Sequence, residues 1–84
     1  MKIIIVDSKN ERQLIEIDPN DNISILKEKI KIKKGINNEI YLHFNGTLLE
    51  DNEKVEFYDI EEKSIIMYTG TFRAGKNFKN IKFK

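Results

Sequence analysis

Two apolar stretches open the chain, separated by a short polar segment. The stretches are MKIIIV and QLIEI, with DSKNER between them. Two β-branched runs joined by a few polar residues predict a β-hairpin. Asn10 is the residue of the polar segment that best adopts a left-handed backbone conformation, so we expect the hairpin to turn there.

Apolar residues next recur at helical spacing. Ile23, Leu26 and Ile30 form one stripe of a helix of about three turns. Asn22 is the expected N-cap, because its side-chain oxygen can accept a hydrogen bond from an unpaired helical amide. Gly35 is the expected end of the helix, since glycine enters the left-handed C′ position without steric cost.

The second half of the chain predicts further strands. EIYLHFNGTLLE indicates a strand, a turn at Asn45-Gly46 and a very short second strand. NEKVEFYDI indicates a loop with one helical turn, and SIIMYTGTF has the composition of a final strand. The order β, β, α, β, β, β predicts an α+β fold in which one helix packs across a mixed sheet.

Length and composition limit the class of protein. A chain of 84 residues allows one domain and leaves no room for a deep substrate cleft. The absence of cysteine excludes disulfides and thiolate metal sites, and it favours an intracellular location, cytoplasmic or nuclear. We find no run of transmembrane length and no signal peptide, so a membrane is not an expected partner.

The sequence offers no recognisable catalytic site. It has no paired nucleophile and base, no glycine-rich loop for phosphates and no acid dyad in a recognisable context. His43 is the only histidine and has no cysteine to accompany it, so a contact on the surface is the expected role and a metal site is not. We therefore predict a protein that is not an enzyme and that uses no metal or cofactor.

Charge is distributed unevenly along the chain. The net charge is +1, yet residues 71–84 carry five basic residues and no acid, which leaves −4 on residues 1–70. A mildly acidic body thus carries a basic arm. The basic residues of this arm are Arg73, Lys76, Lys79, Lys82 and Lys84.

Over about residues 1–73 the sequence resembles ubiquitin. The motifs that carry the resemblance are Pro19-x-Asp21-x-Ile23, Lys27 and Lys29, Gly35-Ile36, Phe44-x-Gly46, Leu49-Glu50-Asp51 and Tyr58-x-Ile60. The resemblance implies a ubiquitin-like β-grasp domain over residues 1–73, with four to five strands packed on one helix. Residues 74–84 would then form a flexible basic tail.

The resemblance also implies particular contacts. Lys27 and Asp51 would form a partly buried ion pair, and the Tyr58 hydroxyl would brace the loop before the last strand. The implied core agrees with the periodicities above. It comprises Ile3, Ile5, Ile15, Ile17, Ile23, Leu26, Ile30, Leu42, Leu49, Ile60 and Ile66.

Three departures from ubiquitin concern binding. Most ubiquitin receptors read a patch of one leucine, one isoleucine and one valine. The corresponding positions are Ser8, His43 and Thr69, all polar. Loss of a single buried anchor typically costs an interface about 2 kcal/mol or more. Ordinary ubiquitin receptors are therefore not expected to bind this protein tightly.

The same sheet face nevertheless carries apolar residues. If Ile3 and Ile5 point into the core, alternation turns other apolar side chains outward. A contiguous outward patch of a few hundred Å² usually marks an interaction site. The alternative is that an Ile-rich chain simply exposes some isoleucines, as Ile25 and Ile32 suggest on the far side of the helix. The predicted partner-binding residues are Ile4, Val6, Leu14, His43, Ile65, Met67 and Thr69.

Phe72-Arg73-Ala74-Gly75 occupies the place of the Leu-Arg-Gly-Gly end of conjugated family members. Such members are activated at a C-terminal glycine, so cleavage after Gly75 would be required before conjugation. Ala74 replaces a glycine, and Thr71 replaces an arginine that helps family members dock on the activating enzyme. The alanine methyl group narrows the allowed backbone angles. These changes indicate a divergent modifier or a protein that is not conjugated.

The basic arm offers a different role. KNFKNIKFK interleaves lysines with Phe78, Ile81 and Phe83, so lysines could contact RNA phosphates while phenylalanines stack on bases. A basic terminus without a function is the plain alternative. We therefore predict a ubiquitin-like protein that binds other proteins, as a non-covalent module or a divergent modifier, with RNA binding through the tail as the alternative.

Overall fold

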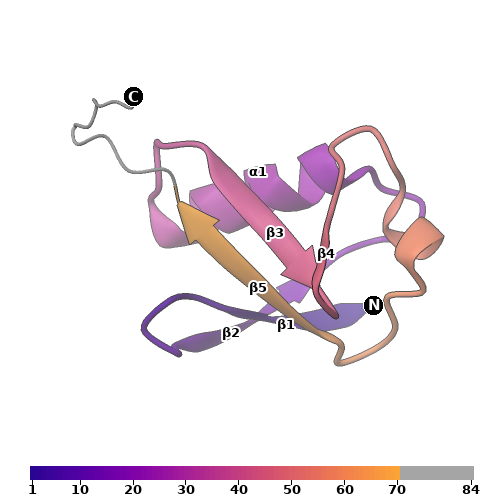
Figure 1. Cartoon of the computed structure of the whole chain (residues 1–84), viewed down its shortest axis with the longest axis horizontal. Coiled ribbons are helices and arrows are strands. Elements are labelled where there is room, and N and C mark those ends of the chain that lie inside the picture. Colours follow the sequence, from indigo (N-terminus) through magenta and orange to yellow (C-terminus); the bar gives the residue numbers. More distant parts are fainter. Residues whose placement is uncertain (71–84) are drawn as a thin grey trace.

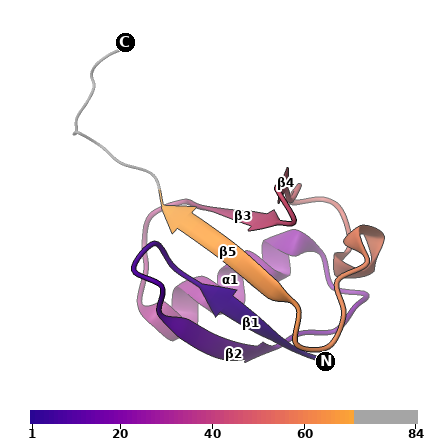
Figure 2. The same cartoon turned by 60° about the horizontal axis from the view of Figure 1, so that its bottom comes forward.

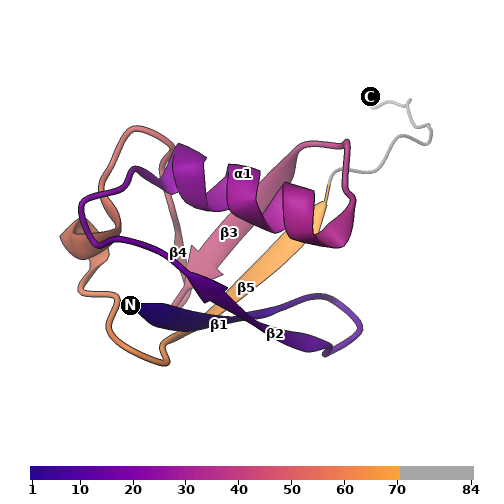
Figure 3. The ribbon, with the colours of Figure 1, turned by 180° about the vertical axis from the view of Figure 1, so that it is seen from behind.

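The computed structural model describes residues 1–70, and these form two layers (Figure 1). One helix lies across one face of a five-stranded sheet, as the view from behind also shows (Figure 3). The strands are β1 (Lys2–Val6), β2 (Arg12–Glu16), β3 (Ile40–Phe44), β4 (Thr47–Leu48) and β5 (Ile65–Gly70). The helix is α1 (Ile23–Lys34), and one 3₁₀ turn, η1 (Val55–Tyr58), precedes the last strand.

The strand order is β2-β1-β5-β3-β4. The two central strands, β1 and β5, are parallel, and the other neighbours are antiparallel. This mixed sheet with one helix confirms the predicted α+β fold of the β-grasp type. The predicted domain boundary at residue 73 lies outside the described residues.

The predicted turns are confirmed by the backbone angles. Asn10 has φ = 70° in the β1–β2 turn, and Gly35 has φ = 67° after α1. Asn45 and Gly46 both have positive φ, 52° and 78°, as a type I′ hairpin turn requires. In the first turn the Asp7 carboxylate accepts a hydrogen bond from the Glu11 backbone amide at 2.9 Å, which lowers the pKa of Asp7.

The predicted side-chain cap at Asn22 is wrong, although Asn22 does occupy the N-cap position. The amides of the first turn already have backbone partners in the segment that follows β4. The Ile23 amide donates to the Glu53 carbonyl at 2.9 Å. The Ser24 amide donates to the Asp51 carbonyl at 3.1 Å. The Asn22 side chain is thus not needed to satisfy them.

The core lies between α1 and the sheet, and all eleven residues that the sequence predicts for it are buried. Three further residues complete it. Ile40 begins β3, Val55 belongs to η1, and Tyr68 lies on β5. The 3₁₀ turn is too short to show a hydrophobic period, so Val55 could not be found from the sequence pattern.

Two predicted polar contacts are also present. The Lys27 ammonium lies 2.6 Å from Asp51 and 3.7 Å from Glu39, and the lysine side chain is largely buried. The Tyr58 hydroxyl accepts a hydrogen bond from the Glu50 backbone amide at 2.8 Å. The ion pair attaches the segment after β4 to α1, and the hydrogen bond joins two residues within that segment. Within residues 1–70, no helix is long and apolar enough to span a membrane.

The left-handed residue that ends α1 gives a prediction about stability. Gly35→Ala should lower the free energy of unfolding by about 1 kcal/mol, because an L-residue is strained at φ = 67° even though a Cβ there would meet nothing within 4 Å. Gly70→Ala is the matched control, since its Cβ would meet only the Glu39 carbonyl at 3.9 Å. Urea denaturation should show a larger loss of unfolding free energy for Gly35→Ala than for Gly70→Ala. Equal losses would contradict the left-handed conformation of Gly35.

Candidate protein-interaction surface

The outer face of the sheet, turned away from α1, is built by the strand register (Figure 2). Residues directly opposite each other on neighbouring strands point to the same side. Ile4 lies opposite Leu14 on β2 and opposite Ile65 on β5. The register therefore brings residues from separate parts of the chain side by side on this face.

The register continues across the other strands. Met67 on β5 lies opposite His43 on β3, and His43 lies opposite Leu48 on β4. Thr69 lies opposite Tyr41. All five strands thus contribute side chains to one surface.

The large apolar side chains of this face are exposed. Leu14, Tyr41, Leu48, Ile65 and Met67 are between 40% and 52% exposed, whereas Ile4 and His43 are partly buried. Contiguous apolar surface of this kind on a small domain usually marks an interaction site. We call the surface the outer apolar patch, defined by Ile4, Leu14, Tyr41, His43, Leu48, Ile65 and Met67.

The prediction that Val6 faces water is wrong, because only 4% of Val6 is exposed. Its strand lies inside the sheet, with Arg12 opposite it on β2 and Met67 opposite it on β5. Both neighbours have longer side chains than valine. Alternation along a strand sets the direction of a side chain but not its exposure, which depends on the neighbours.

Tyr41 and Leu48 belong to the patch and were not predicted. The alternation in IYLHF, with Leu42 in the core, is the signal that could have placed Tyr41 outward. The signal for Leu48 is weaker, because β4 has only two residues and its register follows from the turn before it.

Tyr41 and Leu48 also border a hollow of about 330 Å³ at the edge of the patch. The Lys27 ammonium lies 5.5 Å from the centre of the Tyr41 ring, within the range of a cation–π contact. The ion pair of Lys27 with Asp51 lies in the same hollow. The patch therefore has a polar border on the β4 side, with an uncharged centre.

The opposite border of the patch is charged. Lys2, Arg12 and Glu16 are exposed at the ends of β1 and β2. The N-terminal ammonium lies 2.7 Å from the Glu16 carboxylate, and this hydrogen bond lowers the pKa of Glu16. An uncharged centre with a charged rim is the usual layout of a protein interface.

On the inner side of the sheet, burial raises the pKa of the Tyr68 hydroxyl.

The remaining predicted site residues are placed as follows. Thr69 is exposed at the end of β5, and Ser8 is exposed in the β1–β2 turn. The conjugation residue and the basic arm lie outside the described residues: Gly75, Arg73, Lys76, Lys79, Lys82 and Lys84. Among residues 1–70, no three His, Cys, Asp or Glu side chains gather where they could hold a metal ion.

Comparison with known proteins identifies the type of domain. The sequence profile of the family described as "Ubiquitin-2 like Rad60 SUMO-like" matches residues 1–67. A curated relative from Schizosaccharomyces pombe, named "Ubiquitin-like protein 1", is 32% identical over 62 residues. That alignment covers 73% of this chain and 80% of the relative.

Proposed function

The chain belongs to the ubiquitin-like family of Rad60 SUMO-like domains, and from this premise we propose that it binds a protein partner non-covalently through the outer apolar patch. Domains of this family are non-enzymatic and bind proteins. The observation that carries the proposal is the exposure of apolar side chains from four strands on one face, with the partly buried Ile4 of β1 among them.

The size of the patch suits a reversible partner. Its apolar area is on the order of a few hundred Å², whereas a stable interface buries about 800 Å² on each partner. A partner that covers the patch would also have to contact the polar rim. Such an interface is typical of transient complexes between different proteins rather than of a permanent homodimer.

The composition of the patch indicates which partners to exclude. Ser8, His43 and Thr69 are polar where ubiquitin presents its three apolar anchors. The apolar residues here come instead from Leu14, Ile65 and their neighbours. A receptor shaped for ubiquitin would therefore place apolar groups against polar side chains, at a cost in affinity. We propose that the partner is distinct from ordinary ubiquitin receptors and is met in the cytoplasm or nucleus.

A site-resolved cross-linking experiment tests the patch. With the photoreactive residue benzoylphenylalanine at position 67, light should produce one discrete adduct in cells. Leu14→Lys in the same chain should reduce its yield at least about tenfold, because it places a charge in the apolar centre. Ile25→Lys is the matched control, since Ile25 is exposed to a similar degree on α1. Equal yields from the two lysine variants, or no adduct, would contradict the proposal.

A divergent protein modifier is the second candidate. It is favoured by Arg73-Ala74-Gly75, which keeps part of the end of conjugated relatives. In this proposal a protease removes residues 76–84 and leaves Gly75 as the C-terminal residue. Mass spectrometry of the native protein distinguishes the two candidates, because the non-covalent module retains residues 76–84, whereas the modifier ends at Gly75, either free or attached to a lysine of another protein.

An activation assay tests whether the tail supports conjugation. We expect the full chain to be inert with a ubiquitin-activating enzyme, because activation requires a free glycine carboxylate. The form ending at Gly75 should be charged poorly, since the Ala74 methyl group restricts the backbone. Adding Ala74→Gly and Thr71→Arg to that form should raise thioester formation. Efficient charging of the unaltered Gly75 form would make the modifier the leading candidate.

RNA binding through the basic arm is the remaining alternative. Four lysines among residues 76–84 would contribute up to four ionic contacts to single-stranded RNA. Each ionic contact contributes about −0.7 to the slope of log affinity against log salt. Removal of residues 76–84 should therefore make this negative slope shallower by about 3. Filter binding over a range of salt concentrations measures this slope. Equal binding by the full and truncated chains would eliminate the arm as a nucleic-acid element.

A further inference from the structure

We propose that the domain also associates head to tail with a second copy of itself, so that Phe57 of one copy docks in the hollow at the C-terminal end of α1 of the next. This contact uses neither the outer apolar patch nor the basic arm. It rests on two ends of the domain that are complementary in charge and in shape.

The first end, which we call the acidic end, comprises residues 50–62 around η1. It contains seven carboxylates and one lysine. It lies at the N-terminus of α1, where the carbonyls of Asp51 and Glu53 accept hydrogen bonds from the first amides of the helix. The chain segment is thus fixed to the helix by its backbone, at one end of the domain (Figure 1).

Phe57 projects from the acidic end and is 63% exposed. Its ring contacts the Tyr58 ring edge to face, with the centroids 5.1 Å apart and the planes at 88°. Tyr58 is itself held by the hydrogen bond from the Glu50 amide. The Phe57 amide donates to the Lys54 carbonyl at 3.0 Å. An exposed aromatic ring on a rigid turn is the kind of anchor that interfaces use, because little conformational freedom is lost on binding.

The second end, which we call the basic end, comprises residues 27–34, the last eight residues of α1. Residues 27–34 contain five lysines and one glutamate. Lys27 and Lys34 lie close to carboxylates, and the Lys29 ammonium donates to the Glu16 carbonyl. Within residues 1–70, Lys31 and Lys33 form no such ion pair. These two lysines are available to carboxylates from outside the described domain.

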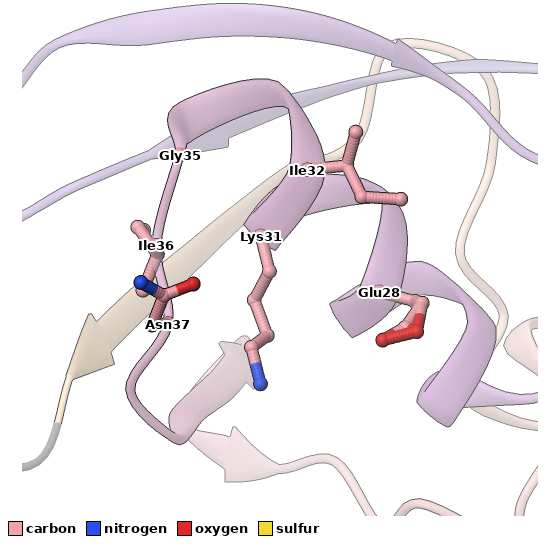
Figure 4. Close-up of a pocket in the computed structure, with 6 residues that line it drawn as sticks. All are labelled: Glu28, Lys31, Ile32, Gly35, Ile36 and Asn37. Carbon is pink, nitrogen blue, oxygen red and sulfur yellow. The ribbon is translucent and has the colours of Figure 1, made fainter.

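A hollow of about 380 Å³ lies at the basic end, beside the exposed Ile32 (Figure 4). Ile32 is 77% exposed, whereas Ile36 is packed partly against the core. Figure 4 shows Ile36 and Asn37 following Gly35 round the end of the helix, with the Lys31 side chain nearby. The hollow therefore offers apolar contacts for an aromatic ring and an ammonium group for a neighbouring carboxylate. It is lined by Glu28, Lys31, Ile32, Gly35, Ile36 and Asn37.

Within one molecule η1, which carries Phe57, and the hollow cannot meet, although Lys27 of the basic end pairs with Asp51 of the acidic end. η1 and the hollow lie at opposite ends of α1, which at twelve residues is about 18 Å long (Figure 3). Acids near a helix N-terminus and lysines near its C-terminus also stabilise the helix, because they interact favourably with its dipole. This interaction accounts for the opposite charges of the two ends. It does not account for the exposure of Phe57 and Ile32. A second copy satisfies both the charges and the apolar side chains.

The contact is heterologous, because different surfaces of the two copies meet. The pair then keeps one free acidic end on one copy and one free basic end on the other, so addition can continue into open chains. Opposite charges at the two ends would favour encounter in the correct orientation and make association sensitive to salt.

Sedimentation velocity of the full chain tests the proposal. Near 50 mM salt the weight-average sedimentation coefficient should rise with concentration through the high-micromolar range. At 500 mM salt the rise should be largely lost. Phe57→Asp and Ile32→Asp should each keep the protein monomeric. Both positions are exposed, so circular dichroism and thermal melting should show a folded domain. Ile25→Asp, on α1 outside the hollow, is the control and should assemble like the unaltered chain.

A mixing experiment makes the test specific. Phe57→Asp retains an intact hollow, and Ile32→Asp retains an intact Phe57. An equimolar mixture should therefore form a dimer and stop there, because the remaining ends are both disabled. The proposal is overturned if the unaltered chain stays monomeric at low salt or if the mixture yields no dimer. It is also overturned if Leu14→Lys abolishes assembly while Phe57→Asp does not, since the outer apolar patch would then be the contact.

Discussion

A single helix can cover only one face of a five-stranded sheet, and this constraint shapes the rest of the domain. The core must form on the inner face, between the sheet and α1, and the residues buried in it are Ile, Leu, Val and one Tyr. The outer face has no layer to pack against and can change composition without loss of the fold. We therefore expect the core to stay ubiquitin-like while the outer surface changes. The polar residues Ser8, His43 and Thr69 are such changes. The surface carries these sequence differences, and the core carries the family likeness.

The helix also depends on the segment after β4. Its first amides are satisfied by the carbonyls of Asp51 and Glu53, and Lys27 on its inner side pairs with Asp51. These contacts replace the side-chain cap expected at Asn22. They also attach this acidic, irregular segment to α1. Phe57 is held on this segment, which explains how an exposed aromatic ring can have a defined position without a long helix or strand beneath it.

The sequence predicted well what depends on local pattern. The period of Ile23, Leu26 and Ile30 located the helix and its buried side, and the positive φ angles of Asn10 and Gly35 followed from residue type. Features that depend on neighbouring strands were harder. Val6 was placed in the patch by alternation, yet exposure depends on flanking side chains. Leu48 and Phe57 belong to elements of two and four residues, too short for any hydrophobic period to show.

The two proposed contacts occupy different parts of the domain, and their geometry makes them compatible. The outer apolar patch lies on the sheet face turned away from α1, whereas the head-to-tail contact uses the two ends of α1. Copies joined end to end would therefore each keep the patch open. A patch of a few hundred Å² gives modest affinity by itself. Linked copies raise the effective concentration of the second and later patches to the millimolar range when the partner presents matching sites. Assembly would thus strengthen binding to a repetitive partner without any change in the patch.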